Sequence, residues 1–307
     1  MIMKHLAKPR AFARRGNIAL AIALAGASIL SGCSGPSGQV GVEDLAAKNQ
    51  AQWVMPMDEF AVASPELGNY AEQLLVGKCL RGKGYEWDVP WQNTDFKWPD
   101  NYNEIGIKIF NVDTAKKWGY RIGSAADPDS SAKWTAFVQF ADSYSPDSSF
   151  QGKFASCLQD VRDPDTMRDA DQRDYVLGLK RQALEVADTQ PAVREALASW
   201  TRCLLEEHNL VAAPSPDQMP TEAISASFSS KGSSTGAPSS EEIAAAVADA
   251  TCRESSGYSA ARYAAEWDAE VDLVSQNREK LDRIRDEAVV HRDELLTVVA
   301  ENAPKAK

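Results

Sequence analysis

The sequence contains few of the side chains that usually perform catalysis or bind metal ions. Only three histidines and five cysteines occur among its 307 residues. No two cysteines stand in a C-x-x-C pair, the spacing typical of structural zinc sites. We therefore expect no metal site and no cofactor, and we do not expect an enzyme.

Basic residues are also scarce relative to acidic ones. The chain has 33 lysines and arginines against 44 aspartates and glutamates. Residues 1–32 hold five of the basic residues and no acidic one, so residues 33–307 carry 33 − 5 = 28 basic against 44 acidic residues, a formal charge of −16. Such a surface repels phosphate backbones and anionic head groups, which argues against nucleic acids as partners.

A hydrophobic run long enough to cross a bilayer is missing at the N-terminus. Ile18–Leu30 is apolar but shorter than the ~20 residues that a membrane-spanning helix needs. Basic residues precede this run and small residues follow it, which is the layout of a secretory signal peptide. Leu30 to Cys33 (LSGC) resembles the bacterial lipobox, which implies cleavage before Cys33 and attachment of acyl chains such as palmitate to it.

We accordingly predict a lipoprotein signal peptide at 1–32 and a flexible, glycine-rich tether at 33–46. Acyl chains on Cys33 would hold the protein in the cell membrane, on its extracytoplasmic face. An ordinary signal peptide with an incidental cysteine is one alternative, and an N-terminal membrane anchor is another.

Four cysteines follow Cys33, and an even number in an exported protein favours disulfides. Cys79, Cys157, Cys203 and Cys252 allow three pairings. We favour Cys79–Cys157 with Cys203–Cys252, because this pairing would crosslink each half of the chain separately.

Apolar residues recur mostly at three- and four-residue steps, which predicts a mainly α fold. The chain would form two disulfide-linked helical halves, an aromatic-rich one at 47–165 and another at 171–307. Alternating isoleucines at 105–109 predict at most one short strand. The expected helices cover residues 65–82, 113–118, the surroundings of 154–157, 176–186, 193–204, 239–252, and about forty residues from 259 onward.

Two segments of different composition would connect these parts. Residues 160–174 form an acidic hinge, and residues 212–238 form a flexible linker rich in serine, proline and glycine. Ser239 and Glu242 make a capping box for the helix after the linker. Ser259 is expected to cap the long C-terminal helix.

The best functional candidates are Trp87, Trp91 and Trp98, in an aromatic-rich loop at 85–98. Exposed tryptophans can stack on sugar rings or anchor a protein partner. The alternative is that these rings cover the core of the first half.

Other patterns have structural explanations. Gly232–Gly236 matches the hydrolase pattern G-x-S-x-G around Ser234, but it lies in linker sequence without the strand and helix that such a site requires. The aspartates between 163 and 174 lack the glycine and glutamate of a calcium loop. We expect His208 to cap a helix end and His291 to pack in the seam of the last helix.

Trp200-x-x-Cys203-Leu204 and Glu242-Ile243-Ala244-x-Ala246-x-Ala248-Asp249-x-x-Cys252 carry a resemblance to known proteins, and Ala115-x-x-Trp118-Gly119-Tyr120 adds to it. These motifs resemble a family of actinobacterial cell-envelope lipoproteins without an assigned activity. The resemblance covers roughly 171–300 and, loosely, 65–125, and it departs at His208-Asn209, where the family has Gly-Tyr. It implies an envelope location, helical content and a Cys203–Cys252 bridge.

Together these observations predict a membrane-tethered lipoprotein that acts as a non-catalytic binding or accessory protein. Its partner would be an envelope membrane protein such as a transporter or sensor. The alternative is a module that binds peptidoglycan glycans through Trp87, Trp91 and Trp98, and a hydrolase comes third.

Overall fold

We describe a computed structural model of the chain. It describes residues 47–61, 65–95, 97–124, 127–162, 164–228 and 237–305, and for residues 164–169 it describes the backbone alone. These residues belong to one compact unit, Val40–Lys307. The predicted signal peptide, Cys33, the tether up to residue 46 and the Gly232–Gly236 pattern lie outside the described residues.

The described residues are mainly helical, as predicted. The α-helices are α1 (Pro65–Gly82), α2 (Val112–Trp118), α3 (Pro128–Ser143), α4 (Phe150–Val161), α5 (Pro164–Thr189), α6 (Pro191–His208), α7 (Glu222–Ala226), α8 (Ser240–Ser255) and α9 (Tyr258–Asn302). Short 3-10 helices are η2 (Gln50–Gln52), η3 (Pro56–Phe60) and η4 (Pro216–Gln218). Within the described ranges, none of the helices is both long and apolar enough to span a membrane.

No strand forms in the part of the chain that the structure describes, which agrees with the prediction of at most one short strand, and the segment at 105–109 forms none. It contains only an isolated antiparallel bridge between Tyr102 and Lys108. Gly106 adopts a φ of +85°, and the Gly106 backbone N–H donates to the Asn103 carbonyl. The chain therefore turns back at Gly106 instead of extending.

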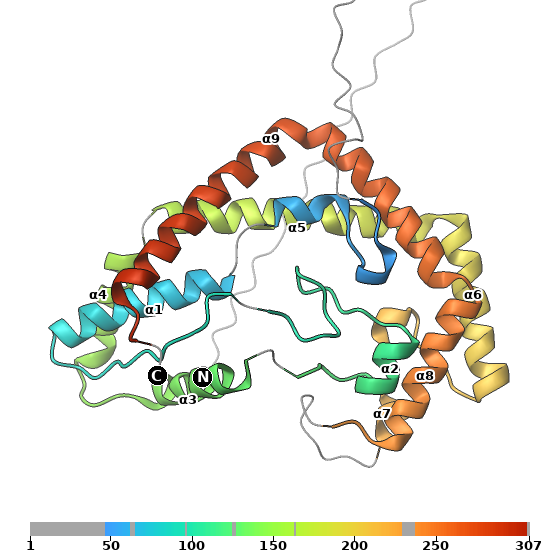
Figure 1. Cartoon of the computed structure of the whole chain (residues 1–307), viewed down its shortest axis with the longest axis horizontal. Coiled ribbons are helices and arrows are strands. Elements are labelled where there is room, and N and C mark those ends of the chain that lie inside the picture. The colour runs from blue at the N-terminus through green and yellow to red at the C-terminus, as the bar shows by residue number, and fades with distance from the viewer. Residues whose placement is uncertain are drawn as a thin grey trace, which may run out of the picture. The chain divides into compact units, whose positions relative to one another are not determined.

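The long helix α9 organises the core. Figure 1 shows it running from the region of α6 and α8 to the region of α1, with α5 alongside, and it packs against all four helices. Val274 and Leu281 pack with Val176 of α5, and Val299 near the end of α9 packs with Leu74 of α1. The C-terminal helix thus joins elements from both predicted halves.

The two disulfides are those that the sequence favours. Cys79–Cys157 connects α1 to α4, and Cys203–Cys252 connects α6 to α8. Each bond therefore fixes a pair of helices that also pack through apolar side chains.

Three connections differ from the sequence interpretation. α5 begins at Pro164, so most of the predicted hinge at 160–174 is helix and not a separate connection. Much of the predicted flexible linker is ordered, because Met219 and Ile224 are buried in the core cluster around α6 and α8. α9 begins after Gly257, whose φ is +71°, and not at a Ser259 cap.

The N-terminal segment, residues 47–61, lies on α9 through polar bonds to the backbone. The Asn49 backbone N–H donates to the Tyr263 hydroxyl at 2.9 Å, and that hydroxyl donates to the Val54 carbonyl at 2.8 Å. The Met57 backbone N–H donates to Glu270 Oε2 at 2.7 Å. Backbone groups that no regular element satisfies are therefore paired by α9 side chains.

Candidate binding cleft

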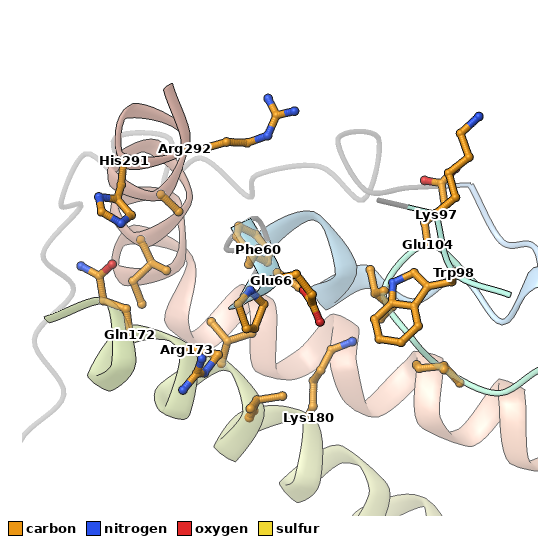
Figure 2. A pocket seen from close by; sticks show the side chains of 18 of the residues that line it. Phe60, Glu66, Lys97, Trp98, Glu104, Gln172, Arg173, Lys180, His291 and Arg292 are labelled. Atoms are coloured by element: carbon orange, nitrogen blue, oxygen red, sulfur yellow. The ribbon is translucent and has the colours of Figure 1, made fainter. Parts of the chain in front are cut away.

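A cleft of about 740 Å³ is the main concave feature that we consider as a functional site. α5, α9, the start of α1 and the loop at 94–107 contribute its lining, as Figure 2 shows for the labelled side chains. Its apolar lining includes Phe60, Ile105, Ile107, Val176, Leu177 and Ile284. This volume lies within the range of roughly 300–1,000 Å³ that is typical of small-molecule sites.

Charged side chains divide between the two walls of the cleft. α5 and α9 contribute Arg173, Lys180, His291 and Arg292 to the lining, and no carboxylate of these two helices lines the cleft among the side chains that the structure describes. The opposite wall contributes the acidic residues, which are Glu66, Asp95 and Glu104, together with Lys97. In Figure 2, His291 lies on the side away from Trp98 and Lys97. The cleft is therefore electrostatically polarised across its width.

The loop at 94–107 is held in shape by Asn103. The Asn103 Oδ1 accepts from the backbone N–H groups of Ile105 and Ile107 at 3.1 and 2.8 Å. Trp98 stacks on Tyr102 with ring centroids 6.0 Å apart, and a Cβ added at Gly106 would lie only 2.6 Å from the Trp98 ring. The position of the Trp98 indole ring thus requires glycine at residue 106.

The three predicted tryptophans have different environments. Trp87 is only 3% exposed and packs against Phe137 and Phe154 in the core of α1, α3 and α4. It cannot stack on a sugar, so the part of the glycan prediction that used Trp87 is wrong. Trp91 is half-buried and lines neither cleft described here, whereas Trp98 lines the main cleft.

A second, more polar cleft of about 440 Å³ adjoins the first one. The two clefts share Glu66, Thr94, Asp95 and Lys97. The remaining lining is mostly hydroxyl and amide side chains with two aromatic rings: Leu67, Asn69, Tyr70, Gln92, Asn93, Asp127, Ser130, Ser131, Trp134 and Thr135. Neither cleft could be located from the sequence, because each is assembled from separated segments.

The motif residues behind the sequence resemblance meet in a buried polar network. Glu242 Oε2 accepts from Arg121 Nε at 2.7 Å, and both side chains are almost fully buried. The Tyr120 backbone N–H donates to Glu242 Oε1 at 3.3 Å. The predicted capping box is therefore only half present: Ser239 accepts from the Glu242 backbone, but the Glu242 carboxylate pairs with Arg121.

Asp249 is the second centre of this network and has no exposed surface. Its Oδ1 accepts from Trp200 Nε1 at 2.9 Å and from Arg253 Nε at 2.8 Å. Its Oδ2 accepts from the Tyr120 hydroxyl at 3.3 Å. Burial and the Asp249 carboxylate raise the pKa of Tyr120 far above its ordinary value, which keeps the phenol protonated. The network ties α6 and α8 to the segment after α2.

Two further carboxylates on α9 are buried beneath the N-terminal segment. Burial raises the pKa of Glu270 to about 7, against an opposing effect of Lys180 and of the bond from Met57. Burial also raises the pKa of Glu266, whose Oε2 accepts from Trp53 Nε1 at 3.3 Å. Both carboxylates contact the fold and neither lines the cleft.

The two histidines of the described chain occupy different places. His208 is exposed at the end of α6, and its ring lies near Cys203 and Cys252. Because these two cysteines form a disulfide, they offer no thiolate to a metal ion. His291 lines the cleft, with its Nδ1 3.5 Å from Glu294 Oε2.

Comparisons with known proteins returned no matching family model, no matching curated protein and no matching solved structure.

Proposed function

We propose that this chain is a membrane-tethered lipoprotein of the bacterial cell envelope, and that it acts as a non-catalytic binding or accessory protein through the cleft between α5 and α9. The LSGC sequence ending at Cys33 supports the tether. The observation that carries the binding role is the cleft itself, whose size and apolar lining suit a ligand or an inserted part of a partner. A transporter or a sensor in the same membrane is the kind of partner that we favour.

The structural contacts of three buried carboxylates also support a binding role. Glu242, Asp249 and Glu270 each hold two parts of the fold together through bonds to residues distant in sequence. The burial and pairing of Glu242 and Asp249, and the raised pKa of Glu270, therefore have structural causes.

Glycan binding remains a second candidate because of two observations. Trp98 lines the main cleft, and the adjoining polar cleft presents Trp134 among amide and hydroxyl groups. Titration with soluble peptidoglycan fragments should then quench tryptophan fluorescence in the parent chain. The quenching should be lost in Trp98→Ala and kept in Trp91→Ala.

The tether is tested at Cys33. Cys33→Ser should leave an unprocessed precursor that incorporates no labelled fatty acid in cells. Continued incorporation of the label into this variant would refute the lipoprotein assignment.

The cleft is tested by photocrosslinking in cells. A photoreactive benzoylphenylalanine replaces Leu177, which lines the cleft and is 52% exposed. Leu205 is the matched control, because it is a helical leucine that is 54% exposed and lies outside both clefts. We expect an identifiable adduct at position 177 and none at 205. Equal yields at the two positions would contradict a binding role for the cleft.

A further inference from the structure

We infer that the cleft binds an anionic membrane phospholipid, with an acyl chain on the apolar surface and the phosphate at the arginines of α5 and α9. This inference rests on the proposed function and names the class of ligand for the same site. It follows from the apolar surface, from the distribution of charge and from the place where the chain is proposed to reside.

The apolar part of the cleft suits a hydrocarbon chain better than a sugar. Val176 and Ile284 belong to the core cluster between α5 and α9, so the cleft exposes an edge of the hydrophobic core. Leu177 is 52% exposed beside them, and Ile105 and Ile107 line the opposite wall. Covering this surface with methylene groups is favourable, because it removes apolar area from water.

The cations of the cleft indicate an anionic group. Arg173 and Arg292 are exposed, and among the described residues neither takes part in an ion pair. This is unexpected for a chain whose residues 33–307 carry a formal charge of −16, calculated from 28 basic and 44 acidic residues. Guanidinium groups bind phosphate through two parallel hydrogen bonds, so arginines suit this ligand well.

The charges on the opposite wall would orient the ligand within the cleft. The carboxylates of this wall at Asp95 and Glu104 would repel a phosphate, so the headgroup should lie toward α5 and α9. In Figure 2 the Arg292 and Arg173 side chains extend in different directions from α9 and α5, so the phosphate would meet one guanidinium group at a time. A neutral glycan would gain little from this separation of charge, whereas an anionic amphiphile would be oriented by it.

The location of the protein makes such a ligand available. A chain anchored at Cys33 has only the predicted tether between the bilayer surface and the first described residue, at position 47. A flexible tether of this length spans roughly 20 Å on average. The described unit would therefore remain close to the phospholipid headgroups.

The test uses the full chain in its own membrane and identifies the adduct at position 177. Peptides that carry benzoylphenylalanine in place of Leu177 are isolated after irradiation, and the added mass is determined by mass spectrometry. We expect the mass of an anionic phospholipid. Its yield should fall at least tenfold in Arg173→Gln/Arg292→Gln. The charge-matched variant Arg202→Gln/Arg283→Gln should keep the yield, because both arginines are exposed and lie outside the cleft.

Each other outcome has a distinct meaning. A protein or glycan adduct at position 177 would overturn the phospholipid inference and leave the proposed binding function standing. A free fatty acid, a neutral lipid, or an equal phospholipid yield in both arginine variants would also overturn the inference. Absence of any adduct above the Leu205 control would refute the inference and the binding function together. Intact disulfides and helical circular dichroism in every variant would exclude misfolding as the cause.

Discussion

Replacing Glu270 by glutamine should stabilise the protein at alkaline pH. Glu270 is only 1% exposed, and its Oε2 accepts a hydrogen bond from the Met57 backbone at 2.7 Å. A glutamine carbonyl oxygen can accept the same bond, but the amide carries no charge that burial would penalise. The substitution therefore separates the cost of the buried charge from the benefit of the hydrogen bond.

The magnitude follows from the pKa of Glu270, which rises from 4.5 to about 7 in the folded protein. At 1.36 kcal/mol for each pKa unit, the difference corresponds to about 3 kcal/mol. Because the folded pKa is above the unfolded one, the stabilising contribution of the protonated carboxyl is complete below pH 4.5. It is lost as the pH rises to about 7. The parent chain should thus lose stability over this window, and Glu270→Gln should lose less.

Urea denaturation followed by circular dichroism at several pH values between 4.5 and 8 measures this effect. We expect equal stability near pH 4.5 and an advantage of up to about 3 kcal/mol for Glu270→Gln at pH 8. Glu301→Gln, at an exposed position on α9, is the control, and it should change the free energy of unfolding at neither pH. Lower stability of Glu270→Gln at pH 8 would refute the reasoning. The attraction between Glu270 and Lys180 would then outweigh the cost of burial.

Three further substitutions test the other structural assignments. Glu242→Gln removes one charge of the buried pair with Arg121 and should lower the free energy of unfolding by about 3–5 kcal/mol. A loss below about 1 kcal/mol would show that the pair is not buried in solution. Trp87→Ala should lower the free energy of unfolding by about 3–5 kcal/mol because it empties the core of the α1, α3 and α4 region. Trp98→Ala should have a clearly smaller effect on stability, and equal effects would contradict the different environments of these tryptophans.

Local patterns in the sequence predicted much of the helical fold. The periodicity of Val193, Trp200 and Leu204 correctly marked the buried face of α6. α3 was missed although Asp127 and Pro128 supply an N-cap and a first-turn proline. Its moderate apolar periodicity is interrupted by polar residues, since the Phe137 side of the helix alone meets the core.

The cleft and the polar network required information that local patterns do not contain. Glu242 occupies the third position of a helix, where a capping role is the natural expectation. Its partner, Arg121, is 121 residues away in the chain. In the sequence alone, Arg173 and Arg292 are likewise ordinary charged residues on separate helices. Only the packing of α5 against α9 brings both into one cleft. Partners that are distant in sequence are set by tertiary packing, which periodicity does not encode.

The attachment of the N-terminal segment to α9 has a mechanical consequence. A force that pulls the chain from its N-terminal side first reaches residues 47–61, before it can load α1. Bonds from Asn49 to Tyr263, from Met57 to Glu270 and from Lys180 to Asp58 connect this segment to the first third of α9 and to α5. These bonds would carry the load together, so tension would be distributed into the longest helix before the first helix could be peeled away.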